Sequence, residues 1–222
     1  MNIVVLPGLD GTGRLLVPFA SQCNARVIAY PTNRELTLDE YVEHAQIENG
    51  AVLIAESFSG PIAVRIAARR SLAALVLVGS FVTPPLPRAL RLLPLATMAR
   101  LQLPDWVLSL MMLSPYTTPE RMRELRDAIG AVHPRVLASR MRIALSVDER
   151  MTLARTNVPL LDLRGRRDRL VLANARGEVV KQRRDATVAD IEGPHALLYT
   201  RSEECWEVIA RWLASRVSVA EL

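Results

Sequence analysis

The chain of 222 residues carries a formal net charge of +5, and 50% of its residues are hydrophobic. This length suits one domain, and the longest apolar runs, such as residues 72–78, are far too short to cross a membrane. The positive charge comes with no clustered aromatic residues and no helix-turn-helix pattern, so we expect neither a nucleic-acid partner nor a membrane span.

The first apolar run of the chain, residues 3–6, is a predicted strand. No charged region precedes it and Pro7-Gly8 ends it, a pattern that differs from a signal peptide, so we expect a cytoplasmic protein. Cys23 and Cys205 lie far apart and outside any metal-binding or redox spacing. We therefore expect reduced thiols, no metal site and no cofactor.

Short apolar runs alternate along the chain with segments of helical periodicity, which predicts a doubly wound α/β fold. Because these runs are apolar at consecutive positions, we expect parallel strands that are buried on both faces. The predicted strands span residues 2–6, 25–29, 51–55, 74–78, 159–164 and 186–191. The predicted helices of this core span residues 15–23, 38–48, 60–70, 174–183 and 203–215.

The alternation stops between residues 81 and 156, where Leu, Met and Arg recur at helical spacing without a convincing strand. We interpret residues 82–156 as an inserted helical cap and residues 1–81 and 157–222 as the α/β core. Several expected cap helices begin with a proline at a first-turn position. These helices span residues 87–97, 105–112, 119–129 and 134–145.

A predicted strand runs directly into residues 56–60, ESFSG, and then into a helical pattern. A serine at such a strand-to-helix turn, with small residues two positions before and after it, is typical of a nucleophile. Ser57 fits this position, with Ala55 and Ser59 as its small neighbours. Ser59 is the rival nucleophile in a shifted register, although Pro61 would fit that turn poorly. A serine that only caps the helix is the non-catalytic alternative.

A glycine-rich loop, LPGLDGTG at residues 6–13, follows the first predicted strand. An oxyanion hole needs two backbone N–H groups, one from such a loop and one from the residue after the nucleophile. We assign these groups to Leu9 and Phe58. The glycine spacing matches neither a dinucleotide-binding fingerprint nor a phosphate loop, which argues against a nucleotide site.

The sequence holds only three histidines that could act as a general base. His44 falls inside a predicted helix, and His133 precedes Pro134 within the expected cap. His195 instead follows the last predicted strand, and the carboxyl edge of a parallel sheet is where sites form. A neutral imidazole at this edge can accept the serine proton and later return it to a leaving group. We therefore predict that His195 is the base.

The carboxylate that orients the base should lie between Ser57 and His195 in the chain, just beyond a strand end. Asp168 occupies such a loop. Asp162, within the preceding strand, and Asp190, within the last strand, are the alternatives. An ion pair of Asp168 with Arg167 or Arg169 is the structural alternative.

The four motifs, in this order, resemble the α/β-hydrolase family over essentially the whole chain. The chain departs from that family because the two usual leading strands are absent, so we expect a shortened, mostly parallel sheet of about six strands. The loop at residues 6–13 together with ESFSG also resembles uncharacterised bacterial hydrolases and the acyltransferase-like part of plant phytyl ester synthases.

The short sheet with a four-helix cap is similar in layout to pimeloyl-carrier-protein methyl ester esterases. That resemblance implies an acidic acyl carrier protein as a partner for cap arginines. The arginines that could receive it here are Arg121, Arg123, Arg126, Arg135, Arg140, Arg142 and Arg150. A solvated cap face is the alternative interpretation of these residues.

These observations together predict a serine esterase that cleaves a small-molecule carboxylic ester or thioester through an acyl-enzyme. We expect the cap to supply a mostly apolar acyl pocket, with Trp106 in its wall. Acyl transfer by the same three residues, carrier-linked methyl ester cleavage and a catalytically silent ligand-binding protein are the alternatives.

Overall fold

The computed structural model describes residues 1–101 and 103–220. Their framework is a six-stranded sheet in the order β2-β1-β3-β4-β5-β6, with every neighbouring pair parallel. The strands are β1 (Ile3–Leu6), β2 (Arg26–Val27), β3 (Val52–Glu56), β4 (Ala74–Val78), β5 (Leu160–Gly165) and β6 (Thr187–Ile191). The prediction of a shortened parallel sheet of about six strands is therefore confirmed.

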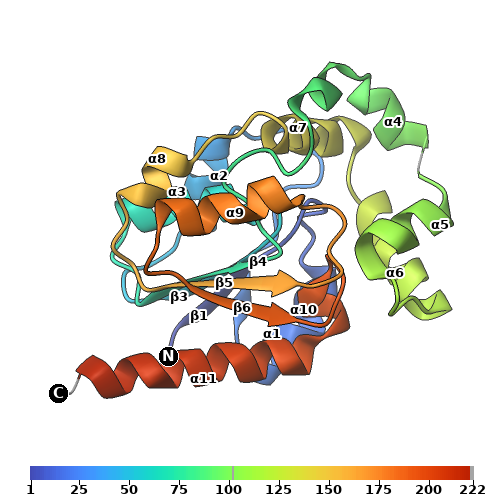
Figure 1. The fold of residues 1–222 in the computed structure, drawn as a ribbon. Coiled ribbons are helices and arrows are strands. Elements are labelled where there is room, and N and C mark those ends of the chain that lie inside the picture. Colours follow the sequence, from blue (N-terminus) through green and yellow to red (C-terminus); the bar gives the residue numbers. More distant parts are fainter. Residues whose placement is uncertain (102, 221–222) are drawn as a thin grey trace.

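Helices cover both faces of this sheet, as Figure 1 shows. In β1, Ile3 and Val5 face a core shared with the helices at residues 17–23 and 202–220, whereas Val4 and Leu6 face a core shared with the helices at residues 38–45 and 59–69. This division follows from strand geometry, because successive side chains point to opposite faces. The flanking helices are α1 (Val17–Cys23), α2 (Leu38–Ala45), α3 (Ser59–Arg69), α8 (Arg150–Ala154), α9 (Ala173–Gln182), α10 (Leu197–Thr200) and α11 (Ser202–Ala220).

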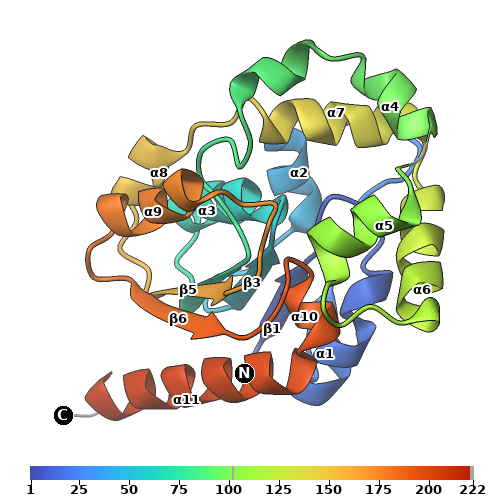
Figure 2. The same cartoon turned by 45° about the vertical axis from the view of Figure 1, so that its right-hand side comes forward.

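The segment between β4 and α8 holds a group of helices that stands beside the sheet (Figures 1 and 2). It comprises a 3₁₀ turn (Arg88–Leu92), α4 (Leu95–Leu101), α5 (Asp105–Leu108), a π-helical turn (Ser109–Leu113), α6 (Pro119–Gly130) and α7 (Pro134–Ala144). By contrast α8, which also lies within residues 82–156, packs against α3 and α9 over the sheet. We refer to residues 88–144 as the helical segment.

Two of the expected helices show why limits in the structure differ from the predicted ones. The helix expected at residues 87–97 is divided at Pro94, because proline disfavours helical backbone at the residue before it. Leu93 accordingly has extended backbone angles, φ −70° and ψ 154°, between the 3₁₀ turn and α4. The helix expected at residues 38–48 ends at Ala45, since Gln46 adopts left-handed angles of φ 46° and ψ 52°.

Several hydrogen bonds attach the helical segment to loops at the carboxyl ends of the strands. The N–H of Ala196 donates to the carbonyl of Met112 at 3.0 Å, and the Tyr116 hydroxyl donates to the carbonyl of Glu192 at 3.0 Å. Arg140 on α7 donates to the carbonyl of Leu9 at 3.0 Å. The segment is therefore joined to the loop after β6 and to the loop after β1.

No helix in residues 1–101 or 103–220 has both the length and the apolar character needed to span a membrane.

Candidate active site

Ser57 lies at a sharp turn between β3, which ends at Glu56, and α3, which begins at Ser59. Its backbone has φ 50°, a left-handed value that is uncommon for a residue with a side chain and costs conformational energy. Three hydrogen bonds hold the turn: Ser57 N donates to Val78 O at 3.0 Å, and the carbonyl of Ser57 accepts from Gly60 N at 3.1 Å and from Ser80 Oγ at 2.7 Å. A strained residue at a sharp strand-to-helix turn is typical of a nucleophile elbow, and we refer to residues 56–60 as the elbow.

The elbow also explains why residue 60 is glycine. A Cβ atom at Gly60 would lie 1.8 Å from the Ser80 Oγ that holds the Ser57 carbonyl. A larger residue would therefore displace Ser80 and loosen the turn.

The structure brings Ser57, His195 and Asp168 into one hydrogen-bonded chain. Ser57 Oγ lies 2.8 Å from His195 Nε2, and His195 Nδ1 lies 2.9 Å from Asp168 Oδ2. An ionised carboxylate can only accept, so Nδ1 carries the ring proton and Nε2 is free to accept from the Ser57 hydroxyl. His195 is 2% exposed and Ser57 is 7% exposed, so the hydrogen bonds between these side chains are largely shielded from water.

The surroundings of Asp168 and His195 shift the pKa values of both side chains. Burial disfavours the ionised form of Asp168, but attraction to His195 and its hydrogen bonds outweigh burial and hold the pKa of Asp168 below its usual value. Two of these bonds come from the backbone N–H groups of Leu170 and Val171, at 2.8 and 3.0 Å. Burial likewise opposes protonation of His195, yet Asp168 raises the pKa of His195 above its ordinary value.

The alternative acids have other surroundings. Asp162 is buried in β5 and accepts from Arg164 Nε at 2.8 Å, and Asp190 is exposed on β6. Arg167 pairs with Glu192 rather than with Asp168, whereas Arg176 Nη2 lies 3.8 Å from Asp168 Oδ1. Within the described chain, Asp168 is thus the carboxylate that bonds to His195.

The other two histidines bond elsewhere. His133 is the N-cap of α7, where its Nδ1 accepts from the N–H of Arg135 at 3.3 Å. The Nε2 atom of His44 lies 2.9 Å from the carbonyl of Ala29.

The glycine-rich loop lies directly beside the elbow. A Cβ atom at Gly8 would be 3.8 Å from the Cβ of Ser57, and the N–H of Gly11 closes a turn on the carbonyl of Gly8 at 3.1 Å. Neither Leu9 N nor Phe58 N donates a hydrogen bond to any residue that the structure describes. Their assignment to an oxyanion hole therefore stays a prediction, with no protein partner to contradict it in the described part of the chain.

Ser59, the rival nucleophile, is fully buried. Its Oγ donates to the carbonyl of Pro7 and lies 2.7 Å from the Tyr30 hydroxyl. The structure gives it no bond to a histidine, and it joins the start of α3 to the loop after β1.

Trp106 lies on α5 with 71% of its surface exposed, so its place in an acyl pocket stays a prediction. A surface hollow of about 530 Å³ lies between α5 and α6, lined among others by Asp105 and Met122. Ser57 and His195 do not line this hollow. In the described residues, no cluster of His, Cys, Asp and Glu could hold a metal ion.

One assignment among the cap arginines is wrong. Arg140 was expected on a surface that could receive an acidic partner, but it is completely buried. Others on the helical segment already have partners: Arg126 pairs with Asp105, and Arg121 Nη1 donates to the carbonyl of Tyr116 at 2.7 Å.

Sequence reasoning missed two residues beside the site, Arg140 and Glu56. Glu56, next to Ser57, is buried, and its Oε1 has no hydrogen-bond partner among the described atoms. An acid at the end of an otherwise apolar strand was a usable signal for Glu56. No comparable signal marks Arg140, because it is one of many arginines in residues 88–144.

Comparison with known proteins is informative at the level of structure. No protein-family model matches the sequence, and no curated protein sequence matches it significantly. An enol-lactonase from Burkholderia xenovorans LB400 matches with a TM-score of 0.77 and 18% identity, covering 96% of this chain and 90% of that one. A thermophilic esterase from Thermogutta terrifontis matches with a TM-score of 0.77 and 19% identity, covering 97% and 90%.

A bromoperoxidase from Bacillus anthracis matches with a TM-score of 0.73 and 17% identity, covering 96% of this chain and 91% of that one. Together with the parallel sheet and the helices on both its faces, these similarities show that the chain has the α/β-hydrolase fold.

Proposed function

We propose that the protein is a serine hydrolase that cleaves a carboxylic ester or thioester of a largely apolar acyl chain. The observation that carries this proposal is the series of hydrogen bonds from Ser57 through His195 to Asp168, beside a loop and a turn whose Leu9 and Phe58 N–H groups have no partner among the described residues. The solved structures with the same fold include a lactonase and an esterase, which supports the proposal by analogy.

In the proposed mechanism, Ser57 Oγ attacks the acyl carbonyl while His195 Nε2 takes the hydroxyl proton. The N–H groups of Leu9 and Phe58 donate to the oxygen of the tetrahedral intermediate. His195 then protonates the departing alcohol or thiol, leaving an acyl-enzyme on Ser57. A water molecule, deprotonated by His195, attacks this acyl group, and Ser57 regains its proton as the carboxylic acid leaves.

Each remaining residue has one task in this scheme. Asp168 fixes the proton of His195 on Nδ1 and stabilises the imidazolium that forms during each proton transfer. The two N–H donors contribute a few kcal/mol each to stabilising the oxyanion. In the same proposal, the helical segment acts as a cap that binds the acyl chain.

Covalent labelling tests the proposal most directly. A fluorophosphonate requires an activated serine, so we expect the folded protein to form one adduct, on the peptide that holds Ser57, and the heat-denatured protein to form none. Mass spectrometry of the intact protein and its peptides gives the stoichiometry and the residue. An unlabelled folded protein would exclude the enzyme in favour of a binding protein, and an adduct on Ser59 would exclude the assigned nucleophile.

A panel of activated esters of increasing acyl length, assayed with and without an added alcohol, then separates two outcomes. Free acid as the main product supports hydrolysis. A new ester that forms in preference to the acid would support acyl transfer by the same residues.

We predict that Glu56→Gln shifts the pH profile of kcat/KM toward lower pH. Burial raises the pKa of Glu56 to about 7, and the Glu56 carboxylate raises the pKa of His195. Because the base must be neutral, activity rises as pH increases through the His195 pKa. Removing the Glu56 charge lowers the pKa of His195, so the acid limb of the profile moves to lower pH.

Glu192→Gln is the matched control, since Glu192 lies in the loop that carries His195 but is exposed and paired with Arg167. Its acid limb is expected to stay in place because solvent screens the charge. Equal profiles for Glu56→Gln and the wild type would show that Glu56 does not influence the base.

A further inference from the structure

Arg140 connects α7 to the loop that carries Leu9. Its guanidinium donates from Nη1 to the carbonyls of Leu9 at 3.0 Å and Asp10 at 2.5 Å, and from Nη2 to the carbonyl of Pro31 at 2.9 Å. Its Nε donates to the Tyr41 hydroxyl at 2.9 Å. One side chain on the helical segment thus holds three carbonyls that belong to the α/β core.

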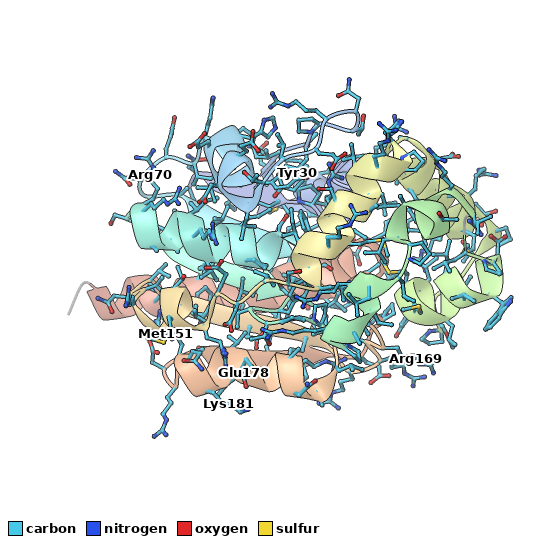
Figure 3. All side chains as sticks on the ribbon, turned by 90° about the horizontal axis from the view of Figure 1, so that it is seen from above. Tyr30, Arg70, Met151, Arg169, Glu178 and Lys181 are labelled. Atoms are coloured by element: carbon cyan, nitrogen blue, oxygen red, sulfur yellow. The ribbon has the colours of Figure 1, made fainter. Side chains whose placement is uncertain are left out.

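This arginine is buried without a counter-ion. Its surface is 0% exposed, and it makes no ion pair with any residue in the described part of the chain. The rings of Tyr30 and Tyr41 complete its surroundings, each with its centroid 5.8 Å from Cζ, and Figure 3 shows Tyr30 close to α7. Burying a charge is costly even when it is hydrogen-bonded, and an apolar side chain would fill the space without that cost.

Arg183 shows the more usual arrangement. It is also buried, and it donates to the carbonyls of Thr156 and Val158, at 2.6 and 2.8 Å, but it pairs with Asp185 as well. Arg140 differs because its positive charge is not neutralised by a carboxylate.

The contacts of Arg140 fix the turn from Gly8 to Gly11. The carbonyl of Gly8 is held by the N–H of Gly11, and the next two carbonyls, of Leu9 and Asp10, are held by Arg140. All three peptide planes of the turn are therefore fixed. Because a trans peptide directs its N–H and C=O oppositely, fixing the Gly8 carbonyl inside the turn directs the N–H of Leu9 away from it.

The fit between Arg140 and the turn depends on glycine at position 11. Gly11 has φ 69°, and a Cβ atom there would lie 2.4 Å from Arg140 Nη1. The loop thus combines a glycine that leaves space for the guanidinium with carbonyls that accept its hydrogen bonds.

We infer that Arg140 is a positioning residue for the oxyanion hole, through which α7 holds the Leu9 N–H in the orientation that receives the developing negative charge. This inference rests on the proposed hydrolase function and adds to it a residue that touches neither the substrate nor Ser57.

Arg140→Lys tests the inference, with Arg183→Lys as the matched control. A single ammonium cannot hold two adjacent carbonyls in the fork geometry of a guanidinium. We expect kcat for an activated ester to fall roughly tenfold to a hundredfold in Arg140→Lys, with KM nearly unchanged, because the hole acts mainly on the transition state. Arg183→Lys should lower the melting temperature but leave kcat unchanged.

Chemical rescue separates positioning from a general loss of packing. Arg140→Ala should regain part of its kcat when guanidinium is added at millimolar concentration, and methylammonium should not replace it. Circular dichroism and the melting temperature establish that each variant is folded. A kcat in Arg140→Lys equal to that of the wild type, or an equal loss in both lysine variants, would overturn the inference.

The outcome for the wild type keeps the two proposals distinct. If the wild-type protein neither hydrolyses esters nor reacts with a fluorophosphonate, the proposed function fails and the role of Arg140 fails with it. If the wild-type protein does both and Arg140→Lys retains full kcat, only the role of Arg140 is wrong.

Discussion

Ser57→Ala is expected to reduce kcat for an activated ester by about 10⁴- to 10⁶-fold, leaving the activity that the oxyanion hole alone provides. The physical reason is that alanine has no oxygen to form the acyl-enzyme, whereas the fold is retained because Ser57 contributes backbone bonds to the elbow. Initial rates over a range of ester concentrations, together with the melting temperature, measure both effects. Alanine does not relieve the strain of the left-handed backbone at this position, so we expect no gain in the free energy of unfolding from this substitution.

Ser59→Ala is the matched control, because it removes the same atom two residues away. It leaves the carbonyl of Pro7 and the Tyr30 hydroxyl without the Ser59 partner, which should cost about 1–3 kcal/mol of the free energy of unfolding. Its loss of kcat should be far smaller than that of Ser57→Ala. Activity that survives Ser57→Ala and disappears in Ser59→Ala would show that Ser59 is the nucleophile.

Asp168→Asn is expected to lower kcat by about 10⁴-fold while leaving the site geometry nearly unchanged. The amide can donate to His195 Nδ1, which would place the ring proton on Nε2 and prevent that atom from accepting the Ser57 proton. The residual activity should also respond differently to pH. Asp168 raises the pKa of His195, so removing its charge lowers that pKa and moves the acid limb of the kcat/KM profile to lower pH.

Asp190→Asn provides the corresponding control. Asp190 is an exposed acid on β6, so its replacement should change neither the pH profile nor, beyond about 0.5 kcal/mol, the free energy of unfolding. A value of kcat in Asp168→Asn close to that of the wild type would mean that another group orients His195.

The order of the α/β elements could be predicted because each buried parallel strand is marked in the sequence by a run of consecutive apolar residues. Strands β3 and β4 are apolar at almost every position, since both faces of the sheet are covered by helices. The limits of the helices were less predictable. The residue at which a helix ends depends on tertiary contacts and on the backbone angles of single residues. Gln46 ends α2 in this way, with no glycine to indicate it.

The candidate residues of the site could be selected for a similar reason. Ser57, Asp168 and His195 each follow a strand, and the ends of parallel strands meet at one edge whatever the remaining sequence is. Pro94, which divides one expected helix, is also visible in the sequence. These features are local, or they follow from a topology that the strand pattern determines.

The sequence by itself determined the α/β class, the chain order of the candidate residues and the presence of a glycine-rich loop beside a serine turn. Only the tertiary structure decided which carboxylate bonds to His195, that Ser59 is held by Pro7 and Tyr30, and that Arg140 is buried. The physical reason is that an arginine enters a protein interior only when partners from distant segments satisfy its hydrogen bonds. For Arg140 these partners lie near residues 9, 31 and 41, about a hundred positions away, where no local pattern records them.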